Sequence, residues 1–271
     1  MTERASSERP NYQIRSVERA LDGLEAFTAE DPALNIDALC ERAHLPKSTA
    51  FKILSVLEHR DYVQRSQDGG SYRVGFQAFE VGNNYLAGLT MLEIVQPILK
   101  GLVTRFPQCA AHVAVLSPVE TKIVYVDVRT RNPLLVPAPI GSQFWAHATA
   151  LGKCLLAGLK GEALELRLAR IEMPQLTANT ITELGEFRRH LEQVRVQGYA
   201  IDDEELSPGN ICVAVPCRER QGTTVASIST SHVKEAMADD MATVVAEMCQ
   251  VAREVSKAMG YAPSPAKTPC L

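Results

Sequence analysis

Residues 35–59 read NIDALCERAHLPKSTAFKILSVLEH, a pattern typical of two helices joined by a tight turn. Asn35 suits the N-cap of the first, short helix, because its side chain can accept a hydrogen bond from a backbone N–H of the first turn. Pro46 cannot continue that helix, but it suits the first turn of a second one. This stretch therefore predicts a helix-turn-helix unit.

The second helix of this unit is expected to have two chemically different faces. Its apolar face comprises Ala50, Phe51, Leu54 and Leu57, and its polar face comprises Ser48, Lys52, Ser55 and His59. The polar face contains no acid. Short hydroxyl side chains let the backbone approach a groove of DNA, and lysine can contact phosphate or guanine. The helix therefore has the pattern of a DNA recognition helix.

A β-hairpin is predicted directly after the second helix. Residues 61–65 and 71–74 each contain Tyr, Val and Arg, and Gln67-Asp68-Gly69-Gly70 between them favours a tight turn. A helix-turn-helix followed by a hairpin is a winged helix, although the same elements can also make a small α+β core without a nucleic-acid partner. The residues expected to contact DNA are Lys47, Ser48, Thr49, Lys52, Ser55 and His59 of the helix and Arg65 and Arg73 of the hairpin.

The charge balance bears on how such a module would bind. The whole chain is acidic, with 28 Lys and Arg against 32 Asp and Glu. From Arg42 to Arg73, however, the sequence contains six basic residues and only three acidic ones. Each neutralised phosphate adds only one unit of salt-dependent attraction, so one module binds modestly. Useful affinity requires two half-sites, and the sequence therefore predicts a dimer or a tetramer.

Length and composition indicate the number of domains and the cellular compartment. A chain of 271 residues predicts two domains. The polar N-terminal residues show no signal peptide, and the uncharged stretch 132–152 contains Pro, Gln and His that exclude a membrane span. Seven cysteines without a C-x-x-C pair favour reduced thiols, and we expect a cytoplasmic protein with no metal site and no cofactor.

The rest of the chain alternates helices and strands. The helix after residue 75 has a narrow apolar seam and could be a connector, a dimer contact or the last helix of the first core. Residues 262–271 are expected to be disordered. The other predicted helices cover 92–106, a stretch opening near 148, 161–171, 183–197 (stopped by Gly198) and 233–259. The predicted extended segments cover 110–117, 122–129, 133–139, 211–217 and 223–230.

Three stretches of the second half suggest a ligand cavity. The helix entry at residues 140–153 exposes backbone N–H groups that favour an anion such as a carboxylate. Residues 202–205 place four acids before a turn, which is usually a solvated loop. Ser227, Ser229 and Ser231 alternate along a strand and share one face, which is either an edge facing water or the wall of a polar pocket.

Four stretches together match a known family in order and spacing. They are LPKSTAFKIL at 45–54, ATALGK at 148–153, TIT at 180–182 and GYAIDDEE at 198–205. From about Ile14 to Tyr261 the chain resembles the IclR family of bacterial transcription regulators. The resemblance implies an α+β protein with a winged helix-turn-helix domain at 11–74, a linker helix at 75–91, a GAF-like α/β effector-binding domain at 92–261 and a disordered tail at 262–271. It also implies homodimers, often associated into tetramers.

The resemblance further implies that a small organic or aromatic acid binds the C-terminal domain and alters operator binding. The pocket carried over from the family motifs comprises the backbone at Ala150 and Leu151, with Asp202, Cys212, Ser229 and Ser231. This chain departs from the family at three positions. His44 replaces a usual Gly and would cost about 1 kcal/mol if that turn needs a positive φ. Lys52 replaces a common Arg, and Trp145 replaces a common Pro, where its ring would suit stacking on an aromatic ligand.

The leading interpretation is therefore a ligand-responsive regulator that binds double-stranded operator DNA. One alternative is an enzyme acting on a small acid, in which Cys212 or Cys154 forms a thiolate–imidazole pair with His147. Another is a sensor that works without DNA, which requires Lys47 and its neighbours on the polar helix face to be occluded.

Overall fold

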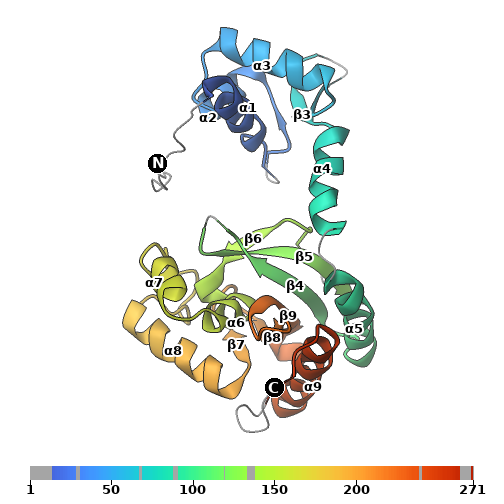
Figure 1. The fold of residues 1–271 in the computed structure, drawn as a ribbon, viewed down its shortest axis with the longest axis vertical. Coiled ribbons are helices and arrows are strands. Elements are labelled where there is room, and N and C mark those ends of the chain that lie inside the picture. Colours follow the sequence, from blue (N-terminus) through green and yellow to red (C-terminus); the bar gives the residue numbers. More distant parts are fainter. Residues whose placement is uncertain are drawn as a thin grey trace. The chain divides into compact units, whose positions relative to one another are not determined.

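The computed structural model describes residues 14–28, 31–66, 69–87, 91–118, 120–132, 138–237, 240–262 and 270. Contacts divide the chain into two compact units, residues 1–89 and residues 90–271 (Figure 1). Among the described residues, no helix is both long enough and apolar enough to cross a membrane.

Three helices and a small antiparallel sheet form the N-terminal unit. The helices are α1 (Arg15–Glu25), α2 (Ile36–Arg42) and α3 (Lys47–His59). The strands are β1 (Ala33–Leu34), β2 (Val63–Arg65) and β3 (Tyr72–Val74), in the spatial order β1-β3-β2. This is the predicted helix-turn-helix followed by a hairpin, with the short strand β1 as an unpredicted addition. Residues 67 and 68 of the predicted turn lie outside the described residues.

The turn between α2 and α3 has the backbone features that its sequence predicts. The Asn35 side chain accepts a hydrogen bond of 2.9 Å from the Ala38 N–H, which confirms the N-cap. His44 has a φ of +52°, so a non-glycine residue stands in the left-handed region here. Pro46 is the N-cap of α3 and stands one residue before the helix rather than in its first turn.

The apolar face of α3 differs from the prediction at one position. Ala50, Leu54 and Leu57 are buried in the core of the unit, as expected. Phe51 is 48% exposed, so its assignment to the packed face was wrong. The buried stripe follows the other three residues, and Phe51 lies at its edge, one turn from Ser55.

Helix α4 (Phe76–Ala87) follows the hairpin. A Cβ at Gly75, just before it, would lie 2.2 Å from the Asp61 carbonyl oxygen, so only glycine fits at this close approach. Phe76 and Phe79 are exposed, with ring centroids 5.9 Å apart. The remainder of the predicted apolar seam, from residue 83 onward, has side chains outside the described set.

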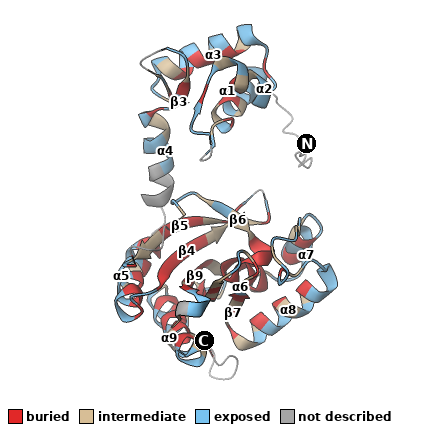
Figure 2. Cartoon of the chain, turned by 180° about the vertical axis from the view of Figure 1, so that it is seen from behind, coloured by how far each residue is buried: buried red, intermediate tan, exposed pale blue. Residues whose placement is uncertain are grey.

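A six-stranded antiparallel sheet forms the centre of the C-terminal unit, in the order β6-β5-β4-β9-β8-β7. Helices α6 and α8 cover one face, and α5 and α9 cover the other (Figure 1), so most strand residues are buried (Figure 2). The elements are α5 (Met91–Arg105), β4 (Ala110–Leu116), β5 (Lys122–Thr130), β6 (Gln143–Trp145), α6 (Ala150–Gly158), α7 (Glu162–Leu168), α8 (Leu184–Gln197), β7 (Ala200–Asp203), β8 (Asn210–Arg218), β9 (Thr224–Val233) and α9 (Met241–Ala258), with short 3-10 turns at Ala146–Ala148 and Lys234–Ala236.

Most of these elements lie where the sequence predicts them, and the start of α9 is the clearest difference. Gly198 ends α8 in the left-handed conformation (φ +84°), as predicted. The long helix predicted from residue 233 was wrong at its start, because β9 continues to Val233, which pairs with Asn210 of β8, and α9 begins at Met241. Residues 133–137, within the third predicted extended segment, lie outside the described residues.

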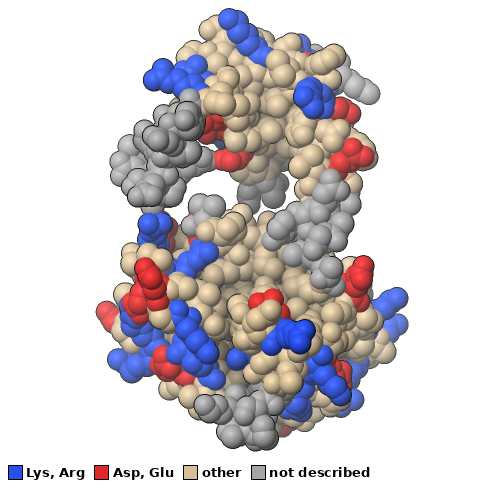
Figure 3. Space-filling view, in the orientation of Figure 1, with Lys and Arg blue, Asp and Glu red and all other residues tan. Residues whose placement is uncertain are grey.

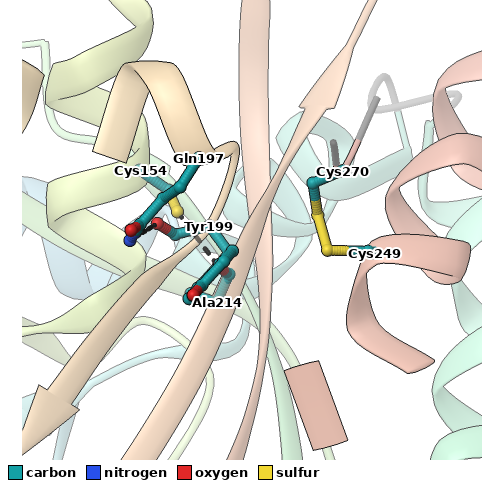
Figure 4. Close-up of a disulfide and its surroundings, with 6 residues drawn as sticks. All are labelled: Cys154, Gln197, Tyr199, Ala214, Cys249 and Cys270. Carbon is teal, nitrogen blue, oxygen red and sulfur yellow. Dashed lines mark hydrogen bonds between the residues drawn. A yellow bond between two sulfur atoms is a disulfide. The ribbon is translucent and has the colours of Figure 1, made fainter. Parts of the chain in front are cut away.

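Cys249 of α9 forms a disulfide with Cys270 (Figure 4). The expectation of reduced thiols was therefore wrong for this pair, whose separation of 21 residues carries no recognisable spacing signal. Cys270 is buried, so the predicted disordered tail is fixed at this residue, whereas residues 263–269 and 271 lie outside the described set. The other five cysteines form no disulfide.

Candidate functional sites

The polar face of α3 is open to solvent in the N-terminal unit. Its exposed residues are Lys47, Ser48, Lys52, Ser55 and His59, and Thr49 is half-buried. Lys and Arg side chains lie along the upper surface of this unit in Figure 3. The condition for a sensor that works without DNA, occlusion of this face, is therefore not met within the chain.

The two lysines of α3 differ in how free their charges are. The Lys47 Nζ lies 2.6 Å from the Asp37 Oδ1 of α2, and this hydrogen bond raises the pKa of Lys47. Such an exposed pair is weak and can be exchanged for a phosphate contact. Within the described part of the chain, Lys52 makes no ion pair, so its charge is free.

The two hairpin arginines also differ. The Arg65 Nη2 donates a 2.7 Å hydrogen bond to the Tyr72 hydroxyl and lies 3.6 Å from the Glu58 carboxylate. Its guanidinium also lies 4.9 Å from the centre of the Tyr72 ring. Among the described residues, Arg73 makes one hydrogen bond, of 3.4 Å, to Gln64 and no ion pair. Arg65 thus stabilises the hairpin through Tyr72 and Glu58. The guanidinium of Arg73 has fewer partners and is more available to a phosphate.

A cavity of about 230 Å³ lies in the C-terminal unit, between the sheet and the start of α6. It brings together six of the seven residues predicted to bind a ligand, namely Ala150, Leu151, Asp202, Cys212, Ser229 and Ser231. The other lining residues are Ala110, His112, Tyr125, Ala138, Phe144, Thr149, Leu206 and Asn210. Their role as ligand contacts stays a prediction.

Strand register places the polar lining residues on one face of the sheet. Ser231 of β9 lies opposite Ala110 of β4 and Cys212 of β8, and Cys212 in turn lies opposite Asp202 of β7. His112 lies opposite Ser229 in the next row. Because neighbouring strands are about 4.8 Å apart, residues distant in the sequence form a continuous polar row.

Helix α6 presents its N-terminus to this row. The Thr149 Oγ1 accepts a 3.1 Å hydrogen bond from the Gly152 N–H and so caps the helix. The N–H groups of Ala150 and Leu151, in the first turn, have no intrahelical acceptor and favour a negative charge. A Cβ at Gly152 would lie 2.3 Å from the Ala146 carbonyl oxygen, so this glycine permits the close packing of α6.

Asp202 is the acidic residue of the cavity. It is 2% exposed, and its Oδ1 accepts hydrogen bonds from the N–H groups of Glu205 (2.8 Å) and Leu206 (3.3 Å). Burial outweighs these bonds and raises the pKa of Asp202 to about 6. Burial also raises the pKa of the neighbouring Cys212 thiol, which is therefore neutral.

An aromatic wall completes the cavity. The rings of His112, Tyr125 and Phe144 stack in sequence, with centroids 4.8 Å apart at each step. Burial lowers the pKa of His112 to about 4, so the imidazole is neutral at pH 7, and its Nδ1 has no hydrogen-bond partner among the described residues. Sequence reasoning missed this wall. The alternation Ala110-His112-Ala114 signals a shared face, but not which strands lie beside it.

Trp145, expected to be either a pocket wall or a packing residue, is not among the residues that line the cavity. Phe144, its neighbour on β6, is the lining residue, because successive strand residues point to opposite faces. The Lys122 Nζ lies 4.6 Å from the centre of the Trp145 ring and makes a cation–π contact there.

Three residues of the family-like motifs, Lys153, Thr180 and Glu205, form a buried structural cluster. Lys153 of α6 is fully buried, and its Nζ donates to the Glu205 carboxylate and, over 3.1 Å, to the Ile201 carbonyl oxygen. Thr180 joins the same cluster by donating to the Glu205 carbonyl oxygen over 2.7 Å. This cluster ties α6 to the segment after β7. Among the described residues, no lysine or arginine lines the cavity itself.

The geometry does not form the thiolate–imidazole pair of the enzyme alternative. The His147 Nε2 hydrogen-bonds the Pro174 carbonyl oxygen, and the Cys154 Sγ donates to the Ala214 carbonyl oxygen over 3.2 Å (Figure 4). Burial raises the pKa of Cys154 to about 12, which keeps it a thiol. In the described ranges no cluster of three or more His, Cys, Asp or Glu could hold a metal ion.

Family models match both units. Residues 16–67 match the IclR helix-turn-helix domain, and residues 83–257 match the C-terminal domain of bacterial transcriptional regulator IclR. The chain belongs to the IclR family. This membership makes it a transcription regulator with a helix-turn-helix DNA-binding domain, not an enzyme.

Named relatives in the IclR family agree over almost the whole chain. The transcriptional repressor IclR of Escherichia coli (strain K12) is 30% identical over 250 residues, which cover 92% of this chain and 91% of the relative. The HTH-type transcriptional repressor AllR of Klebsiella pneumoniae is 28% identical over 278 residues, covering 97% and 99%.

Solved IclR structures share the fold. The Thermotoga maritima IclR structure has a TM-score of 0.71 at 26% identity and covers 92% of this chain and 100% of that chain. An IclR homologue from Microbacterium hydrocarbonoxydans, complexed with 4-hydroxybenzoate, has a TM-score of 0.77 at 22% identity and covers 90% and 98%.

Proposed function

We propose that this IclR-family regulator is a cytoplasmic homodimer that binds operator DNA and responds to a small organic or aromatic acid. Operator contact is assigned to the polar face of α3 and to the hairpin, and the acid is assigned to the cavity under α6. Effector binding would then shift the population between arrangements of the paired DNA-binding units.

The observation that carries the DNA half of this proposal is the free charge of Lys52 on an exposed face without acids. Ser48 and Ser55 flank this charge on the same face, and their short side chains permit close approach to base edges. One such module neutralises few phosphates, which is why we infer paired half-sites. Phe76 and Phe79, exposed on α4, offer apolar area for contact with a second copy.

The cavity supports the effector half of the proposal. Its volume of about 230 Å³ is below the range of roughly 300–1,000 Å³ that is typical of sites for drug-sized ligands, so it suits a small molecule. Helix N–H groups and serine hydroxyls stand on one side and stacked aromatic rings on the other. A carboxylate attached to a small apolar or aromatic body matches both sides. The 4-hydroxybenzoate of the Microbacterium hydrocarbonoxydans homologue is such a molecule.

The test is selection of bound fragments from random DNA by the purified chain, with Lys52→Ala in parallel. We expect a pseudo-palindrome to be enriched, and Lys52→Ala to lower its affinity about tenfold and to reduce the salt dependence by about one counterion. Lys160→Ala removes an exposed charge from the other unit and should change neither quantity. A folded, oligomeric protein that enriches no sequence at low salt would contradict the proposal.

A further inference from the structure

The cavity holds a buried carboxyl group, but none of the described residues that line it carries a cationic side chain. We propose that a carboxylic acid effector binds this cavity together with one proton, which is held between the effector carboxylate and the Asp202 carboxyl. This inference rests on the proposed sensing of an acid. It predicts that the regulator responds to pH as well as to the effector.

The hydrogen bonds of the Asp202 carboxyl favour this residue as the partner of the ligand carboxylate. Both backbone N–H groups that bind the carboxyl, from Glu205 and Leu206, contact the same oxygen, Oδ1. The Cys212 side chain also hydrogen-bonds this carboxyl. Because no backbone N–H of the described residues contacts Oδ2, we assign this oxygen to the ligand. Asp202 stands at one end of the polar row, next to Cys212 and two strands away from Ser231. It lines the same cavity as Ala150 and Leu151 of the first turn of α6.

The nearby charges do not compensate a second carboxylate. Lys153 is the cation closest in the fold, but its ammonium is already bound by Glu205 and by the Ile201 carbonyl oxygen. Lys234 is exposed and pairs with Asp203 and Glu204. The titratable and polar groups that face Asp202 from the other elements are His112 of β4, Tyr125 of β5, Asn210 and Cys212 of β8 and Ser231 of β9. All of these are neutral at pH 7.

Two ionised carboxylates in one small cavity of low dielectric repel each other strongly, and one of them then takes up a proton. A single proton between the two groups replaces this repulsion with a charge-assisted hydrogen bond. The remaining negative charge is stabilised by the first-turn N–H groups of α6. The proton comes from solvent and forms an O–H bond on one of the two carboxyl groups, and no other covalent bond changes.

The pKa of Asp202 in the cavity without ligand determines how many protons are taken up when the acid binds. Because burial raises the pKa of Asp202 to about 6, its carboxyl is ionised at pH 8 and largely protonated at pH 5.5. Binding an anionic acid at pH 8 should therefore take up about one proton, and binding at pH 5.5 only a small fraction of one. The apparent Kd should rise about tenfold for each pH unit above 7.

The experiment is isothermal titration calorimetry of the full chain with pyruvate, benzoate and 4-hydroxybenzoate. Each acid is measured at pH 5.5 and pH 8, in two buffers of different ionisation enthalpy, which reports the number of protons taken up. Benzamide, the neutral counterpart of benzoate, serves as the ligand control and should bind without proton uptake.

Two variants separate this mechanism from a merely structural role. Asp202→Asn keeps the Oδ1 acceptor and supplies an N–H donor where the protonated acid would stand. It should bind the acid at pH 8 about tenfold or more tightly than the wild-type chain, without proton uptake and with a Kd independent of pH. Ser231→Ala should weaken binding but still take up the proton.

The outcomes are distinct. If an acid binds the wild-type chain at pH 8 without proton uptake, the shared proton is ruled out but acid sensing is not. The same conclusion follows if the Kd of Asp202→Asn still depends on pH. Failure of all three acids to bind either protein at either pH overturns the proposed acid sensor itself.

Discussion

The polar face of α3 and the cavity between the sheet and the start of α6 differ in how their charged side chains are placed. On α3 the charges are exposed, and one of them, on Lys47, is only loosely held by Asp37. In the cavity and its surroundings the charges are buried, and each is either paired, as in Lys153 and Glu205, or shifted in pKa, as in Asp202. A surface that binds a polyanion needs exposed, hydrated charges that are not already paired. In a buried site for one small acid, each charged side chain must be paired or neutralised, because an unpaired buried charge is destabilising.

The change expected to have the largest effect on stability breaks the buried pair. Glu205→Gln leaves the Lys153 ammonium buried without a counter-ion, and we expect a loss of about 3–5 kcal/mol in the free energy of unfolding of the C-terminal unit. Urea denaturation followed by circular dichroism measures this loss. The double change Lys153→Met with Glu205→Leu should recover most of it.

The matched control for that variant is Glu165→Gln. It breaks the Arg188–Glu165 pair, in which both contacts are short, 2.6 and 2.7 Å, but the glutamate is exposed. Solvent screens such a pair, so the urea midpoint should not move. If both glutamine variants shifted the midpoint equally, burial would not be what distinguishes the two pairs.

A smaller effect is expected from Asp202→Asn in the protein without ligand. The pKa of Asp202 rises from 3.8 in the unfolded chain to about 6 in the fold, so the folded state binds the proton more tightly. Stability from this group is therefore fully present below pH 3.8 and is lost as pH rises to 6. The variant should be the more stable protein above pH 6, by about 3 kcal/mol, and this gain should shrink toward pH 4.

Thermal unfolding of both proteins between pH 4 and pH 8 measures the difference. A gain that is the same at every pH would show that packing, and not ionisation, explains it.

The smallest predicted effect lies in the N-terminal unit. His44 occupies the left-handed region, and His44→Gly removes that strain at the cost of a more flexible unfolded chain. We expect a stabilisation of about 0.5–1 kcal/mol, measured as slower amide hydrogen exchange in α2 and α3. Because the side chain is exposed and lies outside the polar face of α3, the affinity for DNA should not change. A loss of affinity would place the turn itself in the recognition surface.

The two sites also differ in how far the sequence predicts them. The recognition face comes from 13 consecutive residues of one helix, so helical spacing alone finds Ser48, Lys52, Ser55 and His59. Its one error, Phe51, arose because a residue at the edge of an apolar stripe can pack or face water with nearly the same spacing.

The cavity draws residues from all six strands of a sheet whose order is β6-β5-β4-β9-β8-β7, and no local pattern contains that order. Asp202 and Cys212 were named as pocket residues through family resemblance, whereas Ser229 and Ser231 were also singled out by their alternation along one strand. His112 was missed because its position opposite Ser229 depends on β4 pairing with a strand more than a hundred residues later. Trp145 is not a lining residue because a shift of one residue in a strand reverses the face.

The position of Trp145 has a spectroscopic consequence. It is the only tryptophan of the chain, and it stands beside Lys122 rather than in the cavity. Its fluorescence therefore reports on the neighbourhood of that lysine and is a poor indicator of cavity occupancy. Exchanging it with the adjacent Phe144 would carry the chromophore to the lining position and give the cavity an optical signal of its own.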